Sequence, residues 1–204
     1  MNFRDFKEKV KGFPFFGSDV AEIFSLSPQV MRNQLTRWRE QGLLLEIKRG
    51  LYALAESERQ TGLSREIVAA NIYQPSYISL ESALSIYKLI PERVMAITSI
   101  TTRKTKEFHN PTGAYVYRHL KPALYFGFVA KHDQFGFPYF IAEPEKALLD
   151  YLYLNLGKIN SDGKEYFNES LRLQNRSALN KKQLSNYAQR FAIKKLNRIL
   201  ERLK

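Results

Sequence analysis

The sequence predicts an α+β protein in three parts: a small helical unit that ends in a hairpin, a mixed α/β domain with a mainly antiparallel sheet, and a basic helical C-terminal region. Three observations predict this order. Short amphipathic helical patterns fill residues 1–42, several short runs rich in β-branched and aromatic residues lie between residues 77 and 142, and apolar positions recur at helical spacing among lysines and arginines in residues 163–204. With 44% hydrophobic residues, the chain of 204 residues can bury a substantial core.

The first helix is predicted from Phe3, Phe6 and Val10, which recur at i, i+3 and i+7 and form one buried stripe. A stretch rich in glycine and proline ends this pattern. Ser18 is then expected to cap a second helix, because a serine side chain can accept a hydrogen bond from a free N–H of the first turn.

The third helix carries the clearest start signal in the chain. Ser27 is a suitable N-cap, and Pro28 follows at the first helical position, where its missing N–H costs nothing. Met31, Leu35 and Trp38 recur at i, i+4 and i+7, so this side of the helix is expected to face the core.

Two short apolar runs follow the third helix. Gly42 is expected to end that helix with a left-handed turn. Leu43–Ile47 and Leu51–Leu54 then flank the tight basic turn at residues 48–50, a pattern typical of a hairpin. Helix, helix, turn, helix and hairpin in this order predict a winged helix-turn-helix over residues 1–58.

A winged helix-turn-helix that binds DNA places its second helix in the major groove, with its N-terminal residues at the base edges. Arginine suits guanine, asparagine and glutamine suit adenine, and a threonine methyl suits thymine. The free N–H groups at the helix start and cations at the wing tip suit the phosphate backbone. The residues expected to read bases are Gln29, Arg32, Asn33, Thr36 and Arg37, and those expected to hold the backbone are Ser27, Lys48 and Arg49.

A second reading of this unit stays open. An outward helix face is polar in any soluble protein, and winged helices also serve as docking modules for other proteins. Residues 1–60 carry ten Lys/Arg against eight Asp/Glu, so local net charge does not decide between the two readings. The hypotheses are therefore sequence-specific binding of double-stranded DNA and a protein–protein interaction module that uses the winged helix and the basic tail.

The middle domain is expected over residues 65–157, after the polar linker Glu56–Ser64. Ser79 is expected to cap a short helix. The strands, indicated by β-branched content or by alternation, are Tyr77–Ile78, Val94–Thr101, Ala114–Leu120, Leu124–Val129 and Phe137–Ala142. A further helix is expected to begin at Pro144, with acidic residues in its first turn.

Two blocks of this domain resemble the AbiEi family of abortive-infection antitoxins. The first is Tyr77–Leu84, followed by Leu89–Glu92 and Thr98–Thr102, and the second is Ile141–Asp150, a proline-started helix that ends in Leu-Leu-Asp. The resemblance covers roughly residues 10–157, and the family places a winged helix ahead of this domain.

The resemblance implies a transcriptional repressor of its own operon that acts through the winged helix on its promoter region. It also implies antagonism of a nucleotidyltransferase toxin in a type IV toxin–antitoxin system, where the two proteins need not touch. Members of the family also exist as stand-alone regulators, so the resemblance is compatible with that role as well. The matching blocks are expected to define the fold, so the resemblance assigns no binding residue.

Nothing in the sequence predicts an enzyme, a cofactor or a metal site. The three histidines, His109, His119 and His132, are far apart and form no ligand pair. Phosphate-binding and nucleophile-elbow motifs are absent. The lack of cysteine excludes a disulfide scaffold, a thiol nucleophile and a cysteine-ligated metal.

The N-terminal residues do not resemble a signal peptide, and no apolar run is long enough to cross a membrane, so a cytoplasmic location is expected. The formal net charge of +12 favours an anionic partner, most often nucleic acid. Residues 158–204 carry twelve Lys/Arg against four Asp/Glu, which is +8 of that charge.

This C-terminal region, residues 158–204, is expected to form amphipathic helices. Asn180 and Gln183 match an N-cap and its N3 partner, and a second helical stripe follows at Ile193, Leu196, Leu200 and Leu203. Two roles stay open: helices packed on the middle domain with solvated lysines, or an arm that contacts phosphates or an acidic partner.

Overall fold

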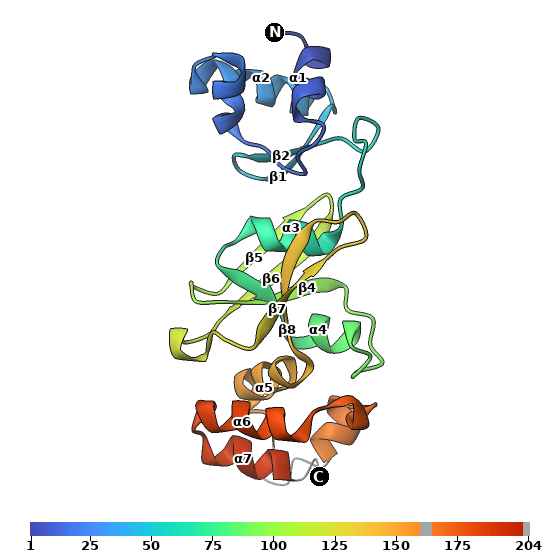
Figure 1. Ribbon diagram of the computed structural model, residues 1–204, viewed down its shortest axis with the longest axis vertical. Helices are drawn as coiled ribbons and strands as arrows, with labels where there is room; N and C mark the ends of the chain where they lie inside the picture. Colours follow the sequence, from blue (N-terminus) through green and yellow to red (C-terminus); the bar gives the residue numbers. More distant parts are fainter. Residues whose placement is uncertain (160–164, 202–204) are drawn as a thin grey trace.

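A six-stranded sheet occupies the centre of the molecule, with the N-terminal unit at one end of the long axis and a layer of helices at the other (Figure 1). The computed structural model describes residues 1–159 and 165–201. The α+β class, the sheet with its antiparallel pairs and the C-terminal helices are as the sequence predicts.

The N-terminal unit has the predicted order of elements. They are α1 (Phe3–Val10), the 3-10 helix η1 (Ser18–Phe24), α2 (Pro28–Glu40), β1 (Leu44–Lys48) and β2 (Leu51–Leu54). The Ser27 hydroxyl oxygen accepts the Val30 N–H at 3.3 Å, and Gly42 has a φ of +72°, so both ends of α2 are confirmed. Antiparallel pairing of β1 with β2 confirms the hairpin.

The start of η1 differs from the prediction. Ser18 lies inside the 3-10 helix, and Gly17 is its N-cap residue. A glycine is needed there because a Cβ at Gly17 would lie 2.7 Å from the carbonyl oxygen of Gly50 in the hairpin turn. The backbone N–H of Gly17 instead donates to a carboxylate oxygen of Asp19 at 3.0 Å.

Aromatic packing sets the orientation of α2. The ring of Phe6 lies 4.6 Å from that of Trp38 and 5.2 Å from that of Phe16, measured between centroids. Met31 and Leu35 are fully buried beside them, as predicted. With this side of α2 turned toward α1, the opposite side faces solvent.

The β1–β2 hairpin contributes to two cores. Leu44 and Leu54 pack in the core of the N-terminal unit, whereas Ile47 and Ala53 are buried in the core of the middle domain. The side-chain amide of Asn110 also donates to the Ile47 carbonyl oxygen at 3.0 Å. The hairpin therefore joins the two units rather than belonging to the first alone.

The central sheet has the strand order β5-β6-β4-β3-β8-β7. Its strands are β3 (Ser76–Ile78), β4 (Ala96–Thr101), β5 (Lys106–Asn110), β6 (Gly113–His119), β7 (Phe128–His132) and β8 (Pro138–Ala142). The pairs β3–β4, β5–β6 and β7–β8 are antiparallel, while β4–β6 and β3–β8 are parallel. Antiparallel pairs are thus the majority, as predicted.

Two parts of the middle domain depart from the sequence patterns. The expected strand Leu124–Val129 is mostly a turn: Leu124 is the last residue of the 3-10 helix η2 (Pro122–Leu124), and β7 begins only at Phe128. The turn contains Gly127 at a φ of +70°, a conformation that ends regular pairing. The patterns also do not predict β5 or the helix α3 (Arg65–Ile72), which packs over the sheet.

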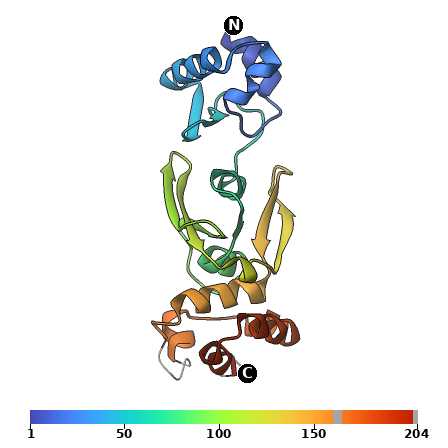
Figure 2. The same cartoon turned by 90° about the vertical axis from the view of Figure 1, so that its left-hand side faces the viewer.

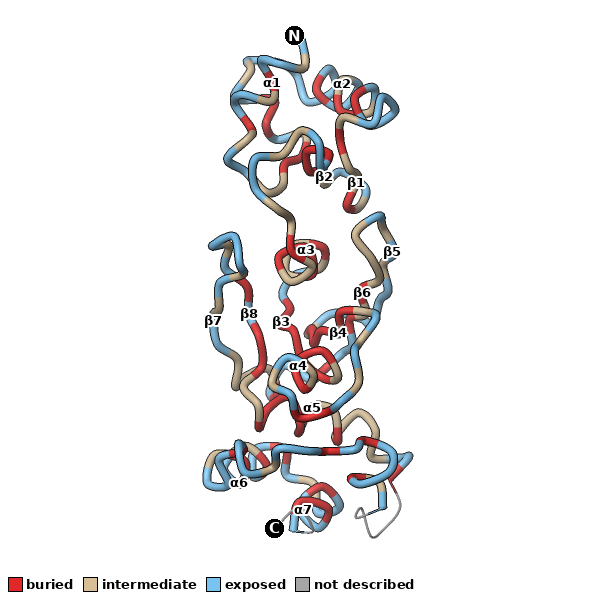
Figure 3. Tube along the Cα trace, turned by 90° about the vertical axis from the view of Figure 1, so that its right-hand side faces the viewer, coloured by how far each residue is buried: buried red, intermediate tan, exposed pale blue. Residues whose placement is uncertain are grey.

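Helices line the other end of the sheet. α4 (Leu80–Ile86) and α5 (Pro144–Asn155) lie between the sheet and the C-terminal layer (Figure 3). That layer holds the π-helix η3 (Tyr166–Ser170), the 3-10 helix η4 (Arg176–Ala178), α6 (Lys181–Phe191) and α7 (Lys194–Glu201). Pro144 at the start of α5 and Asn180 as the cap of α6 confirm two predictions, and Leu203 lies outside the described residues.

A buried polar network ties α5 to the sheet. Lys146 forms an ion pair with Asp150, and both side chains are fully buried. The Tyr77 hydroxyl donates to Asp150 at 3.0 Å, and the Ser79 hydroxyl donates to it at 2.9 Å. Ser79 precedes α4 as predicted but makes no side-chain cap, since Asp150 takes its hydroxyl. Burial lowers the pKa of Lys146 and raises that of Asp150, so each ion depends on its partner to stay charged.

We expect Lys146→Met to lower the free energy of unfolding by about 3–5 kcal/mol, because it leaves the Asp150 carboxylate buried without a counter-ion. The double variant Lys146→Met/Asp150→Asn should recover part of this loss, since a neutral amide still accepts from Tyr77 and Ser79. Urea denaturation measures both. Lys182→Met, at an exposed lysine of α6, is the control. A double variant no more stable than Lys146→Met would contradict this account.

Candidate nucleic-acid interface

The exposed side of α2 holds most of the side chains expected to read bases. Gln29, Arg32, Asn33 and Arg37 are exposed, and Thr36 is half-buried. The helix start is also accessible, because Ser27 is exposed while its hydroxyl caps the first turn. The structure therefore brings these predicted residues together on one face.

Three of these side chains are hydrogen-bonded to one another. The Gln29 amide nitrogen donates to the Asn33 side-chain oxygen at 3.0 Å, and an Arg32 guanidinium nitrogen donates to the Gln29 side-chain oxygen at 2.8 Å. Residues three and four apart on a helix are surface neighbours, which allows this arrangement. The three polar side chains are thus linked to one another within the protein.

The two predicted wing residues have different environments. Arg49 is exposed at the hairpin turn. Lys48 is half-buried and turned toward the middle domain, where its ammonium group donates to the Ile72 carbonyl oxygen at 2.5 Å and to that of Asn71 at 3.5 Å. Lys48 therefore already has partners at the C-terminal end of α3, which its charge stabilises, and its contact with a DNA backbone stays a prediction.

A basic loop that the sequence patterns do not predict as part of the site lies beside the wing. Arg103, Lys104 and Lys106 are exposed at and after the end of β4. Arg103 lies 4.5 Å from the centre of the Tyr73 ring, and the Tyr73 hydroxyl donates to the Lys104 carbonyl oxygen at 3.2 Å, so this segment is held against α3. Three cations within four residues could have indicated this basic surface from the sequence. The signal is hidden when charge is summed over the middle domain, because that domain as a whole is nearly balanced in charge.

The basic loop, defined as residues 103–106, belongs to a cluster of like charge. Burial lowers the pKa of Lys48, and repulsion from Arg103 and Lys106 lowers it further, which places the three cations close together. Within the described ranges, no carboxylate forms an ion pair with Arg103, Lys104 or Lys106. An anion at this surface would relieve the repulsion.

The exposed side of α2, the wing and the basic loop line up in space. Figures 2 and 3 both show α2, the β1–β2 hairpin and the β5–β6 edge of the sheet above one another along one side of the long axis. These elements carry exposed polar groups on α2 and exposed cations at the wing turn and the basic loop, a combination that suits a polyanion with readable edges.

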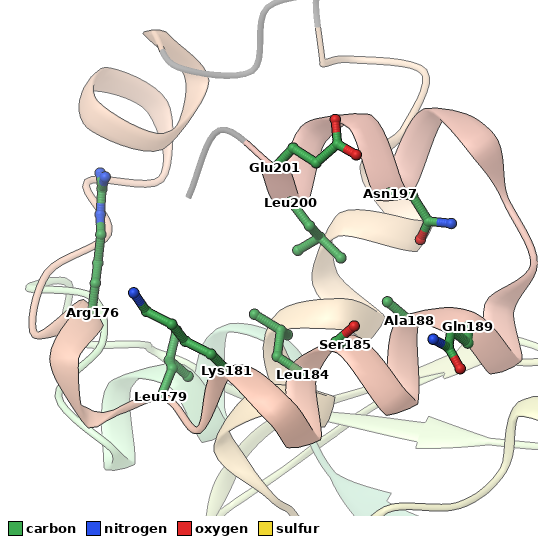
Figure 4. Close-up of a pocket in the computed structure, with 10 residues that line it drawn as sticks. All are labelled: Arg176, Leu179, Lys181, Leu184, Ser185, Ala188, Gln189, Asn197, Leu200 and Glu201. Carbon is green, nitrogen blue, oxygen red and sulfur yellow. The ribbon is translucent and has the colours of Figure 1, made fainter. Parts of the chain in front are cut away.

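A cavity at the opposite end of the molecule is one alternative site. About 270 Å³ in volume, it lies between η4, α6 and α7, with Leu184 and Leu200 among its apolar walls (Figure 4). Arg176 and Lys181 stand at one end of it and Gln189 and Asn197 at the other, with Glu201 beside Leu200. No hydroxyl group in the lining is hydrogen-bonded to a side chain that could act as a general base. The lining therefore provides no activated nucleophile.

Three further features of the described part of the chain concern metal binding, the role of a histidine and the length of its helices. There, no three His, Asp or Glu side chains gather in a group that could hold a metal ion. His119 bonds through a ring nitrogen to the Arg103 carbonyl oxygen at 2.9 Å, so it braces the basic loop. No helix in residues 1–159 or 165–201 is long and apolar enough to cross a membrane.

Comparisons with known proteins return no relative. No protein-family model matches the chain, and no curated protein is similar to it in sequence. The resemblance to the AbiEi family therefore depends on the two sequence blocks alone.

The contact of Lys48 with the end of α3 leads to a stability prediction. Lys48→Ala should lower the free energy of unfolding by about 1 kcal/mol, the usual scale for a cation at a helix C-terminus. Arg49→Ala, next to it but exposed, should stay within about 0.5 kcal/mol of the parent. Urea denaturation of both variants measures these changes in the free energy of unfolding. Equal changes for the two variants would show that the contact of Lys48 with α3 contributes nothing to stability.

Proposed function

We propose that the protein is a sequence-specific DNA-binding transcriptional repressor that inserts α2 into the major groove. The observation that carries this proposal is the exposed face of α2, where Gln29, Arg32 and Asn33 form an organised set of polar groups at the N-terminal half of the helix. These residue types at this end of the helix suit contacts to base edges.

The surroundings of α2 support the same proposal. The β1–β2 hairpin, whose turn carries Arg49, and β5, which begins at Lys106 of the basic loop, lie on the same side of the molecule as α2. Among the described residues, Arg49 and the cations of the basic loop form no ion pair with a carboxylate. When a helix lies in the major groove, cations on the same face of the protein can neutralise the phosphates that border the groove. The DNA contact would thus extend from the winged helix onto the middle domain.

The resemblance to the AbiEi family adds two elements to the proposal. The DNA would be the promoter region of the protein's own operon, and the protein would be the antitoxin that antagonises a nucleotidyltransferase toxin of a type IV system. Both elements depend on the sequence blocks at residues 77–102 and 141–150. Such antagonism needs no direct contact with the toxin, so a cytoplasmic regulator without a stable protein partner fits it.

Binding to a duplex from upstream of its own gene tests the repressor proposal. We expect Arg32→Ala to lose about 1–3 kcal/mol on this duplex, because a good bidentate base contact contributes that much discrimination, and to change binding to a non-specific duplex little. Arg103→Ala/Lys106→Ala should weaken binding to both duplexes and reduce the salt slope by about two units, one for each lost phosphate contact.

Lys182→Ala is the matched control, since it removes an exposed cation at the far end of the molecule and should change neither quantity. Fluorescence anisotropy at two salt concentrations gives all of these values. Binding that is insensitive to salt, or equal for every variant, would refute the proposal and favour the protein–protein module, whose apolar contacts would not depend on counterion release.

A further inference from the structure

The hydrogen bonds among Gln29, Arg32 and Asn33 limit what this face of α2 can recognise. The Gln29 amide donates to Asn33 through its nitrogen and accepts from Arg32 through its oxygen. Both polar atoms of Gln29 are therefore engaged, which fixes the orientation of its amide group. Gln29 acts as a positioning residue that holds its two neighbours.

The groups on this face that make no hydrogen bond at all are donors, whereas each amide oxygen keeps only one of its two lone pairs free. An amide that pairs with adenine must accept from N6 while it donates to N7. Here the side-chain oxygens of Gln29 and Asn33 each accept a bond within the trio, whereas the Asn33 amide N–H groups and the remaining guanidinium N–H groups of Arg32 have no partner among the described residues. Guanine presents two acceptors, N7 and O6, in the major groove, so it is the base that matches these donors.

An aliphatic side chain stands beside these donors. Val30 is 43% exposed, three residues before Asn33 on the same side of α2, while its neighbour Met31 is fully buried. A valine side chain is stiff at χ1, so its methyl groups have a fixed direction. The only apolar group on a base edge in the major groove is the thymine methyl, which gains from contact with an aliphatic side chain.

We infer that α2 reads a guanine through Arg32 and Asn33 and the methyl group of a thymine through Val30, with the two bases in the same or neighbouring steps of one site. The spacing supports this, because side chains three apart on a helix are about 5–6 Å apart and base pairs repeat about every 3.4 Å along the axis. The inference rests on the proposed function and adds the base chemistry that the site selects.

The thymine contact is tested on a duplex that the full-length protein enriches from a randomised pool. Replacing thymine by uracil in this duplex removes only the methyl group, and the wild-type affinity should fall about four-fold, the value of one buried methylene-sized group. Val30→Ala should bind the two duplexes equally. Val129→Ala, a truncation at a similarly exposed valine of β7, should keep the four-fold difference.

The guanine contact is tested on the same duplex with 7-deazaguanine, which lacks the N7 acceptor. Wild-type affinity should fall about five-fold or more for one lost base contact, and Arg32→Ala should show no such loss. Gln29→Ala should narrow the preference for guanine over adenine while the salt slope stays that of the wild type, a result that a purely structural role for Gln29 would not produce.

The outcomes separate the inference from the proposed function. If the wild type and Val30→Ala lose equally on uracil, or if the wild type is indifferent to 7-deazaguanine, the base assignment is overturned. Salt-sensitive binding to the enriched duplex would still leave the DNA-binding proposal intact. If no duplex is enriched above the starting pool, the proposed function fails, and the inference fails with it.

Discussion

The buried ion pair of Lys146 with Asp150 is the interaction on which the middle domain depends. Asp150 receives the hydroxyl groups of Tyr77 and Ser79, so one carboxylate connects α5 with β3 and with the start of α4. Lys146 also lies 5.0 Å from the centre of the Phe126 ring, in the turn before β7. A charge in this position is stable only while every partner stays in place, which makes the arrangement specific as well as stable.

The surface proposed to meet DNA depends on that domain through the hairpin. Ile47 is buried in the middle-domain core, and Lys48 binds the carbonyl groups at the end of α3. The wing turn with Arg49 and the basic loop are consequently held in one arrangement relative to α2. A groove-reading helix with an attached cationic surface of fixed geometry gains its affinity without first ordering a mobile arm.

Local signals in the sequence predicted much of this structure, and contacts distant in sequence account for what they missed. The Ser27–Pro28 start of α2 and the Asn180 cap of α6 depend only on neighbouring residues, so both were predictable. The role of Lys48 was not, because its partners at the end of α3 are more than twenty residues away. β5 was missed since an exposed edge strand rich in charge has no apolar alternation to reveal it. The basic loop became visible as part of the candidate site only when folding placed it beside the wing.

The shared hairpin also bears on how the molecule unfolds. In outline the chain looks like separate units arranged along one axis, a shape that ordinarily melts in steps. Here β1 and β2 supply Leu44 and Leu54 to one core and Ile47 and Ala53 to the next, so neither core can open without exposing apolar surface of the other. The shared hairpin accordingly couples α2 to the central sheet, so a change deep in the middle domain would also lower the stability of the N-terminal unit.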